Sequence, residues 1–213
     1  MEERTITVTG QSKLTIPPDS IAINMTLTTL KEGYNEAIEA AGEDLNELRK
    51  CLNSVGFTKE EIKTTDFQVN TRYENVKDDS GNFKRVFKGY EVINRLRVEF
   101  PEDPIRLAKV LNSLSFCSAK PEFSISYEIK NKKEFEERLI EAAIVDATSK
   151  AEKMVAAAGV KLGKLIKIDG GNSFIGINNR LMGLKLSVSD TSLDLEPANI
   201  TGEASVTMMW RIE

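Results

Sequence analysis

The sequence contains no histidine and only two cysteines among its 213 residues. Histidine is the usual general base near neutral pH and the commonest transition-metal ligand, so its absence argues against hydrolase triads and common metal centres. Residues 159–164 fail as a phosphate loop because the spacing is one residue short. Residues 78–82 fail as the start of a calcium loop because Gly89 stands where a bidentate glutamate is needed. We therefore expect no enzymatic activity, no cofactor, and no catalytic, cofactor-binding or metal-binding residues.

The two cysteines are too few for a disulfide framework in a chain of this size. Cys51 falls in a helical pattern beside Leu48 and Leu52, and Cys117 follows the apolar stretch at residues 114–116. This context favours two small buried thiols. A redox pair is the alternative, but nothing in the sequence places the two sulfurs together.

Strong charge of one sign and long apolar runs are also lacking. The net charge is −4, so the chain has no general attraction to phosphate backbones and nucleic acid is not expected as a partner. No apolar run approaches the ~18 residues of a transmembrane helix. Residues 1–4 lead directly into a strand pattern without the features of a secretory signal. The sequence as written predicts a cytoplasmic protein, or a periplasmic or exported one if a leader has been trimmed.

One long helical pattern runs from Asn131 towards Gly159. Its apolar positions recur at spacings of three or four, namely Phe135, Leu139, Ala143, Ala147, Ala151, Met154 and Ala158. Asn131 with Glu134 three positions later predicts a capped start, and Gly159 predicts the end. At ~1.5 Å per residue the helix would be on the order of 40 Å long, so we expect it to lie across a sheet.

The remaining chain supplies strands that are apolar on one side only. Alternation of apolar and polar residues is found at residues 5–10, 21–28, 65–74, 83–100, 123–129 and 200–212. Shorter amphipathic helices are indicated at residues 37–55 and 104–114, the second opened by Asp103-Pro104. One-sided strands and single-striped helices predict an α+β protein, with two layers in which helices pack on one face of antiparallel sheet.

The strand at residues 83–100 sets the expected domain organisation. It follows turn residues at 78–82, places Val86 and Tyr90 on one face, and contains Gly89 as the position of a bulge. At ~3.3 Å per residue it would span roughly 60 Å, and strands this long usually bend. We therefore expect two intertwined subdomains that share it. Residues 1–92 would form a ββαββ subdomain and residues 93–213 a second one, whose last strand, residues 198–213, is able to pair back with the first sheet.

Four arginines, at positions 72, 85, 95 and 97, could make one sheet face basic. Three glutamates, at positions 74, 91 and 99, share that face by parity. The pattern favours a mutually neutralised solvent face over an anion-binding one.

Residues 170–197 lack a clear period although they contain many apolar side chains. Loops this long are uncommon in compact domains and are usually functional or mobile. We expect either a segment that packs on its own subunit or is disordered, or a protein–protein contact. The candidate interface residues are Phe174, Ile175, Ile177, Leu181, Met182 and Leu184.

Several short motifs occur together in a characteristic order. They are Pro18-Asp19-Ser20-Ile21-Ala22, Ile62-Lys63-Thr64-Thr65-Asp66-Phe67, Gly89-Tyr90-Glu91-Val92, Lys150-Ala151-Glu152, Ala157-Ala158-Gly159-Val160-Lys161-Leu162-Gly163 and Glu196-Pro197. By the order and spacing of these motifs, nearly the whole chain resembles the SIMPL-domain family, whose bacterial members include periplasmic antigens and oxidative-stress-defence proteins. The resemblance implies a two-part α+β fold, a large ring-shaped homo-oligomer in at least one periplasmic relative, and roles in stress tolerance or protein interaction. It supplies no established catalytic residues.

These observations predict a non-enzymatic protein that forms a homo-oligomer through its sheet edges and the 170–197 segment, and that acts in stress response or protein interaction. Two alternatives remain open. One is a small-ligand-binding protein or enzyme that uses a cleft between the subdomains. The other is an adaptor that binds a partner strand at an exposed sheet edge.

Overall fold

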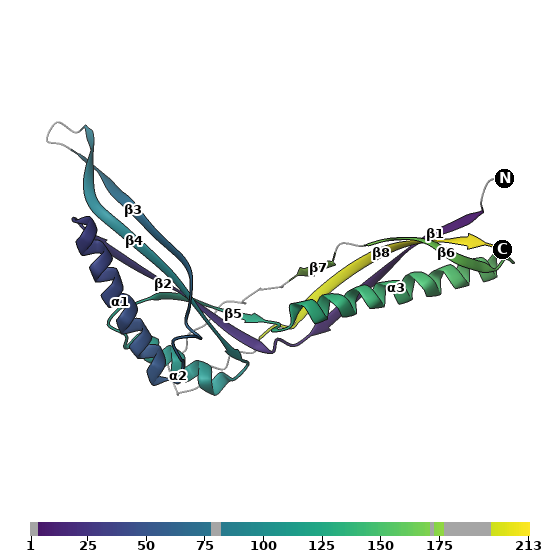
Figure 1. Ribbon diagram of the computed structural model, residues 1–213, viewed down its shortest axis with the longest axis horizontal. Coiled ribbons are helices and arrows are strands. Elements are labelled where there is room, and N and C mark those ends of the chain that lie inside the picture. The colour runs from purple at the N-terminus through teal and green to yellow at the C-terminus, as the bar shows by residue number, and fades with distance from the viewer. Residues whose placement is uncertain (1–3, 78–81, 171–172, 177–196) are drawn as a thin grey trace. The chain divides into compact units, whose positions relative to one another are not determined.

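The computed structural model describes residues 4–77, 82–170, 173–176 and 197–213, and it confirms the α+β class (Figure 1). The helices are α1 (Tyr34–Ser54), α2 (Pro104–Ser115) and α3 (Lys132–Ala157). The strands are β1 (Thr5–Ile16), β2 (Ser20–Lys31), β3 (Lys63–Lys77), β4 (Phe83–Pro101), β5 (Glu122–Glu128), β6 (Leu162–Asp169), β7 (Ser173–Gly176) and β8 (Ile200–Ile212).

The elements form two compact units, each with its own antiparallel sheet. The first unit combines β1, α3, β6, β7 and β8, and the second combines β2, α1, β3, β4, α2 and β5. The chain passes between them after Pro18 and after Glu128. The division therefore does not fall at residue 92, where the sequence placed it. The long strand β4 is not shared, because it is bonded to β2 and β3 within a single sheet.

In the first unit, the first and last strands of the chain are paired along their full lengths. The sheet order is β1-β8-β6, with β7 also paired to β8, and the register runs from Thr5 opposite Arg211 to Ile16 opposite Ile200. Strand β1 is twice as long as the alternation at residues 5–10 indicated. The buried side of β8 carries alternate residues from Ile200 to Trp210, as its sequence predicts.

Helix α3 lies unusually close to this sheet because two glycines face it. A Cβ on Gly10 would sit 2.0 Å from the carbonyl oxygen of Ala143, and one on Gly202 would sit 2.6 Å from Leu139 Cδ1. The hydroxyl of Ser12 donates to the Leu139 carbonyl over 2.7 Å. The helix backbone at Ala143 and Ala147 thus packs directly against the backbone of β1 at Gly10, and this contact leaves no room for a side chain at position 10.

The ends of α3 match the sequence prediction, but two residues assigned to its buried face do not. The Asn131 side chain accepts a hydrogen bond from the backbone N–H of Glu134, and Gly159 has φ +69° beyond the helix end. The buried positions repeat every four residues and end at Val155. Met154, which the sequence assigned to that face, is 53% exposed, because the four-residue repeat continues at Val155 instead. Ala158, also assigned to that face, follows the last helical residue and is exposed.

In the second unit, α1 and α2 cover one face of a sheet with the order β3-β4-β2-β5. The core between them is made of large apolar side chains from β2, β4, α1 and α2, among them Ile21, Ile23, Met25, Leu48, Leu52, Leu96, Val98, Leu107 and Val110. Helix α2 starts as predicted. Asp103 is its N-cap and Pro104 its first residue, and the Asp103 carboxylate accepts hydrogen bonds from the N–H groups of Ile105 and Arg106.

Candidate functional site

The described part of the chain holds no group of three or more cysteine, aspartate and glutamate residues placed to bind a metal ion. A shallow depression lies between α1 and α2, lined by Ser54, Val55, Lys109, Asn112 and Ser113. Among the helices that the structure describes, none is long and apolar enough to cross a bilayer.

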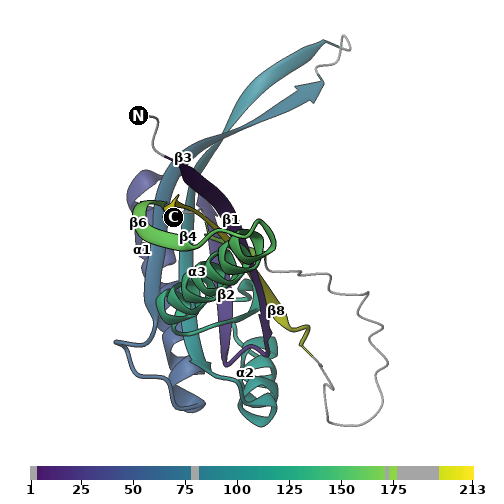
Figure 2. The same cartoon turned by 90° about the vertical axis from the view of Figure 1, so that its right-hand side faces the viewer.

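The outer half of the β3–β4 hairpin is the most unusual surface of the second unit. Strand β2 pairs with β4 only as far as Lys31 opposite Tyr90. Beyond that point β3 and β4 pair with each other alone, and they extend past the N-terminal end of α1 (Figures 1 and 2). We call this two-stranded extension, residues 72–77 and 83–89, the ribbon. A lone two-stranded ribbon has only marginal stability in water.

A bulge at Gly89 decides which side chains face which way in the ribbon. Gly89 has φ +126°, and a Cβ there would lie 2.1 Å from the carbonyl oxygen of Lys31, so glycine is required. The register shifts by one residue between Arg72 and Tyr73. As a result Phe87 joins Tyr90 on one face. The prediction that Val86 lies on that face is therefore wrong, although the bulge itself is confirmed.

The bulge builds a row of aromatic side chains along one face of the ribbon. Tyr34 at the start of α1 contacts Tyr90 with ring centroids 5.4 Å apart, Tyr90 contacts Phe87 at 5.5 Å, and Phe87 contacts Tyr73 at 5.5 Å. All three pairs meet edge to face, the arrangement that ring quadrupoles favour. Closer to the core, Tyr90 packs against a small cluster formed by Ala37 and Ala41 of α1 and Val92 of β4, so the row continues the face that α1 covers elsewhere.

Cations and exposure complete the character of this ribbon face. The Arg85 guanidinium lies 4.2 Å from the Tyr73 ring centroid, and the Lys77 amine lies 5.4 Å from that of Phe83. Phe83 is 70% exposed, and Tyr73 and Phe87 are each more than 40% exposed. The ribbon therefore presents an aromatic and cationic surface beyond the N-terminal end of α1, where that helix does not cover it.

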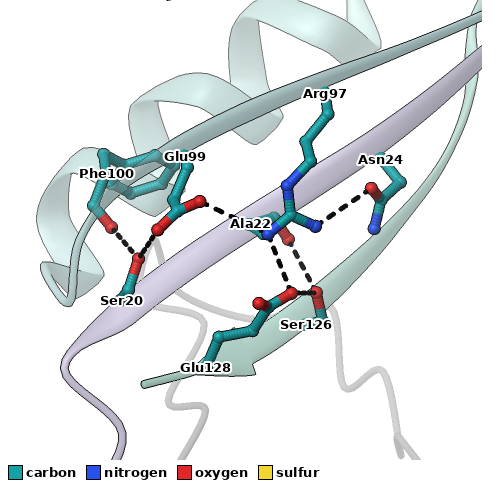
Figure 3. A network of polar contacts seen from close by, with 8 residues as sticks. All are labelled: Ser20, Ala22, Asn24, Arg97, Glu99, Phe100, Ser126 and Glu128. Atoms are coloured by element: carbon teal, nitrogen blue, oxygen red, sulfur yellow. Dashed lines mark hydrogen bonds and ion pairs between the residues drawn. The ribbon is translucent and has the colours of Figure 1, made fainter. Parts of the chain in front are cut away.

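A network of polar side chains spans three strands on the sheet face opposite the helices (Figure 3). Arg97 on β4 binds Glu128 on β5 at 2.9 Å and Glu99 at 3.4 Å, and it donates to the Asn24 side chain over 3.3 Å. The Ser20 hydroxyl donates to Glu99 over 2.9 Å. These bonds tie β4, β2 and β5 together near the point where the chain leaves this unit.

The cation of this network, Arg97, is paired with both of its carboxylates, Glu99 and Glu128, so the network resembles a structural clamp more than a ligand site. Partial burial lowers the pKa of Arg97, but the hydrogen bond and the charge of Glu128, with those of Glu99, outweigh it and leave the pKa raised. Arg72 and Arg95 are likewise paired, with Glu91 and Asp66. The predicted neutralised face is thus observed for Arg72, Arg95 and Arg97, whereas Arg85 lies over the Tyr73 ring instead.

Comparison with known proteins identifies the family of the chain. A family model described as "SIMPL: Protein of unknown function (DUF541)" matches residues 6–210. The chain belongs to the SIMPL family. It is also 24% identical over 164 residues to the 26 kDa periplasmic immunogenic protein of Brucella melitensis biotype 1, and equally to that of Brucella abortus strain S19. These matches cover 76% of the chain but only 65% of the length of each Brucella protein.

The interface residues predicted from sequence lie in and beyond β7 of this SIMPL chain. Phe174 and Ile175 belong to β7, where their backbones pair opposite Glu203 and Gly202 of β8. The other four, Ile177, Leu181, Met182 and Leu184, lie outside the described residues. Their role in an interface stays a prediction.

Sequence reasoning missed two features of the SIMPL chain. The residues of the ribbon were predicted only as strands on either side of a turn at residues 78–82, although a 19-residue β4 beside a 12-residue β2 leaves several residues of β4 without that neighbour. Nothing in the sequence indicated that the two cysteines meet, yet their sulfurs are 2.6 Å from each other. No local pattern could have indicated that contact, since 66 positions separate the two residues.

Proposed function

We propose that this SIMPL protein is a non-enzymatic, self-associating protein, and that the ribbon of one copy docks on the surface of another. The observation that carries the proposal is the aromatic row from Tyr34 to Tyr73, together with the 70% exposed Phe83 on the same ribbon. Exposed aromatic side chains clustered on a projecting element are typical of protein contacts, where aromatic residues and arginine supply most of the binding energy. The marginal stability of a two-stranded ribbon also favours a bound state.

Charge supports a second copy of the chain as the partner. Five basic and three acidic residues give residues 72–88 a net charge of +2, whereas the whole chain carries −4, so the remainder carries −6. Two ribbons would repel each other, but a ribbon is complementary to the acidic remainder of another copy. A contact between unlike surfaces is heterologous, and heterologous contacts close into rings or continue as filaments.

The location proposed for the chain follows the relatives. Both Brucella proteins are named as periplasmic, and on that ground we favour the periplasmic setting over the cytoplasmic one. Within it the assembly would act in stress response or protein interaction, as the family resemblance implies.

Light scattering coupled to size exclusion tests the proposal with a matched pair of variants. Phe83 on the ribbon and Ile105 on α2 are each 70% exposed, so Phe83→Glu and Ile105→Glu remove equally exposed apolar side chains and add the same charge. We expect the wild type and Ile105→Glu to elute as one closed multimer, and Phe83→Glu to shift towards monomer. Higher salt should also weaken the assembly, because exposed charges are screened.

Other outcomes would contradict the proposal in identifiable ways. A wild type that is monomeric at high protein concentration would rule out self-association. Equal loss of assembly in Phe83→Glu and Ile105→Glu would show that the ribbon is not the contact. A third variant with residues 174–184 replaced by a Gly/Ser linker tests the interface predicted from sequence. If only that variant dissociates, the contact lies there and not on the ribbon.

A further inference from the structure

The contact between Cys51 and Cys117 joins two helical segments of the second unit. Cys51 lies in the last turn of α1, and Cys117 follows the end of α2. Their Sγ atoms are 2.6 Å apart, and both residues are free thiols in the structure. Cys117 is 3% exposed and belongs to the main core of the unit, while Cys51 is half-buried.

Hydrogen bonds around Cys51 fix the two segments in this relation. The carbonyl oxygen of Cys51 accepts from the Ser54 hydroxyl on its own helix and from the Ser113 hydroxyl on α2, each over 2.7 Å. The backbone N–H of Cys117 donates to the Leu114 carbonyl over 3.2 Å, which fixes the turn that carries the second thiol. The two sulfurs are therefore held together by the packing of α1 against α2.

We propose that Cys51 and Cys117 are a modification site, oxidised to an intramolecular disulfide by a small disulfide or by a protein dithiol oxidase. The more accessible Cys51, as its thiolate, attacks one sulfur of the oxidant, breaks its S–S bond and releases one thiol. Cys117 then gives up its proton and attacks the Cys51 sulfur, which expels the second thiol. The protein loses two hydrogens and two electrons, and the oxidant disulfide gains them as two thiols.

The environment makes this site slow towards small reagents. Burial, and then the hydrogen bond with Cys117, raise the pKa of Cys51 to about 11, so the nucleophilic thiolate is scarce at neutral pH. Once the mixed disulfide forms, the second step is fast because Cys117 is already in place. An oxidising compartment would hold the pair as a disulfide, whereas a glutathione-reduced cytosol would hold two thiols.

The bond would also stabilise the second unit. Closing a loop between residues 66 positions apart restricts the unfolded chain, and the expected rise in the Tm of this unit is roughly 10 °C. The same cross-link fixes the end of α2 against α1 without any change in the core.

Mass spectrometry of the intact chain tests the site. The protein is incubated with mixtures of oxidised and reduced glutathione, then unfolded and alkylated. We expect the wild type to lose both alkylation sites together and to lose the mass of two hydrogens, and a Cys51–Cys117 peptide should appear in the digest. Cys117→Ser should stop at one glutathione adduct on Cys51, and its Tm should not respond to the redox mixture.

Three results would overturn the proposal. The first is full alkylation of both thiols once the reaction with oxidised glutathione alone has reached its end point. The second is a glutathione adduct that persists on the wild type. The third is a disulfide-linked dimer on a non-reducing gel. The wild-type mass and peptide map decide the matter even if Cys117→Ser does not fold. None of these readouts depends on whether the ribbon drives assembly.

Discussion

The contact between Gly10 and α3 leads to a sharp prediction about the first unit. In Gly10→Ala the new Cβ would lie 2.0 Å from the Ala143 carbonyl oxygen and 2.4 Å from the Ala147 nitrogen. Both are backbone atoms of a helix and cannot turn aside as a side chain could. Ordinary contact starts at 3.4 Å, so the helix would have to retreat by 3.4 − 2.0 = 1.4 Å.

The size of the effect follows from that retreat. A gap of even 0.5–1 Å removes about a quarter to a half of the dispersion energy across a contact. The buried stripe of α3, from Phe135 to Ala151, would lose part of its packing against β1 and β8. We expect a loss of about 3–5 kcal/mol, more than overpacking of flexible side chains usually causes. That corresponds to a fall in Tm of roughly 12 °C or more for a unit of this size.

The chain provides separate optical probes of its two units. The single tryptophan, Trp210, is 5% exposed in β8 and reports on the first unit. All four tyrosines, Tyr34, Tyr73, Tyr90 and Tyr127, belong to the second. Urea unfolding followed by tryptophan fluorescence should show the loss in Gly10→Ala, while tyrosine circular dichroism should not change.

Gly42→Ala is the matched control for this substitution. Gly42 lies inside α1 with nothing within 4 Å of the position of a new Cβ. Alanine there should stabilise the second unit by about 0.5–1 kcal/mol. The reasoning fails if Gly10→Ala unfolds within 0.5 kcal/mol of the wild type, since α3 would then not pack backbone against backbone on the sheet.

Three further predictions concern the cap, the clamp and pH. Asp103→Ala should destabilise the second unit by about 1 kcal/mol in urea, since two N–H groups lose their acceptor, and an unchanged midpoint would show that α2 needs no cap. Arg97→Met should cost about 1–2 kcal/mol in the same assay because Glu128, whose side chain is 13% exposed, loses its cation, and full stability would show that the clamp is dispensable. The hydrogen bond from Lys150 holds the pKa of Asp146 below its usual range. Its stabilising contribution is therefore present above about pH 4 and lost as the pH falls through the folded-state pKa. Urea unfolding followed by tryptophan fluorescence at pH 3 and pH 6 should show that the free energy of unfolding changes less with pH in Asp146→Asn than in the wild type. An equal change in both proteins would refute this.

Local signals predicted the elements of the fold well. Asn131 and Asp103 cap their helices as expected, and the alternation ending at Trp210 assigns the buried face of β8 correctly. Each of these features depends on residues a few positions apart, where hydrogen-bonding chemistry and periodicity act directly. The α+β class follows from the same patterns.

The organisation of the sheets could not be predicted in this way. Strand β4 has the length to serve two sheets, but its partners are decided by tertiary pairing, so the boundary fell at Pro18 and Glu128 instead. The exposed row at Phe87 depends on a one-residue shift at Gly89, which exchanges the two faces of the ribbon. The meeting of Cys51 and Cys117 depends on how two helices pack. Such relations are set by contacts between distant residues, and no local pattern encodes them.

Hydrogen–deuterium exchange of the full chain at several protein concentrations tests the role of the ribbon most directly. If the ribbon docks on another copy, amides at residues 72–77 and 83–89 will exchange slowly at high concentration and faster on dilution. In Phe83→Glu they will exchange fast at every concentration, and amides of β8 will not respond in either protein. Ribbon exchange that is the same at all concentrations, in a protein that light scattering shows to be assembled, would contradict the account and place the contact elsewhere on the chain.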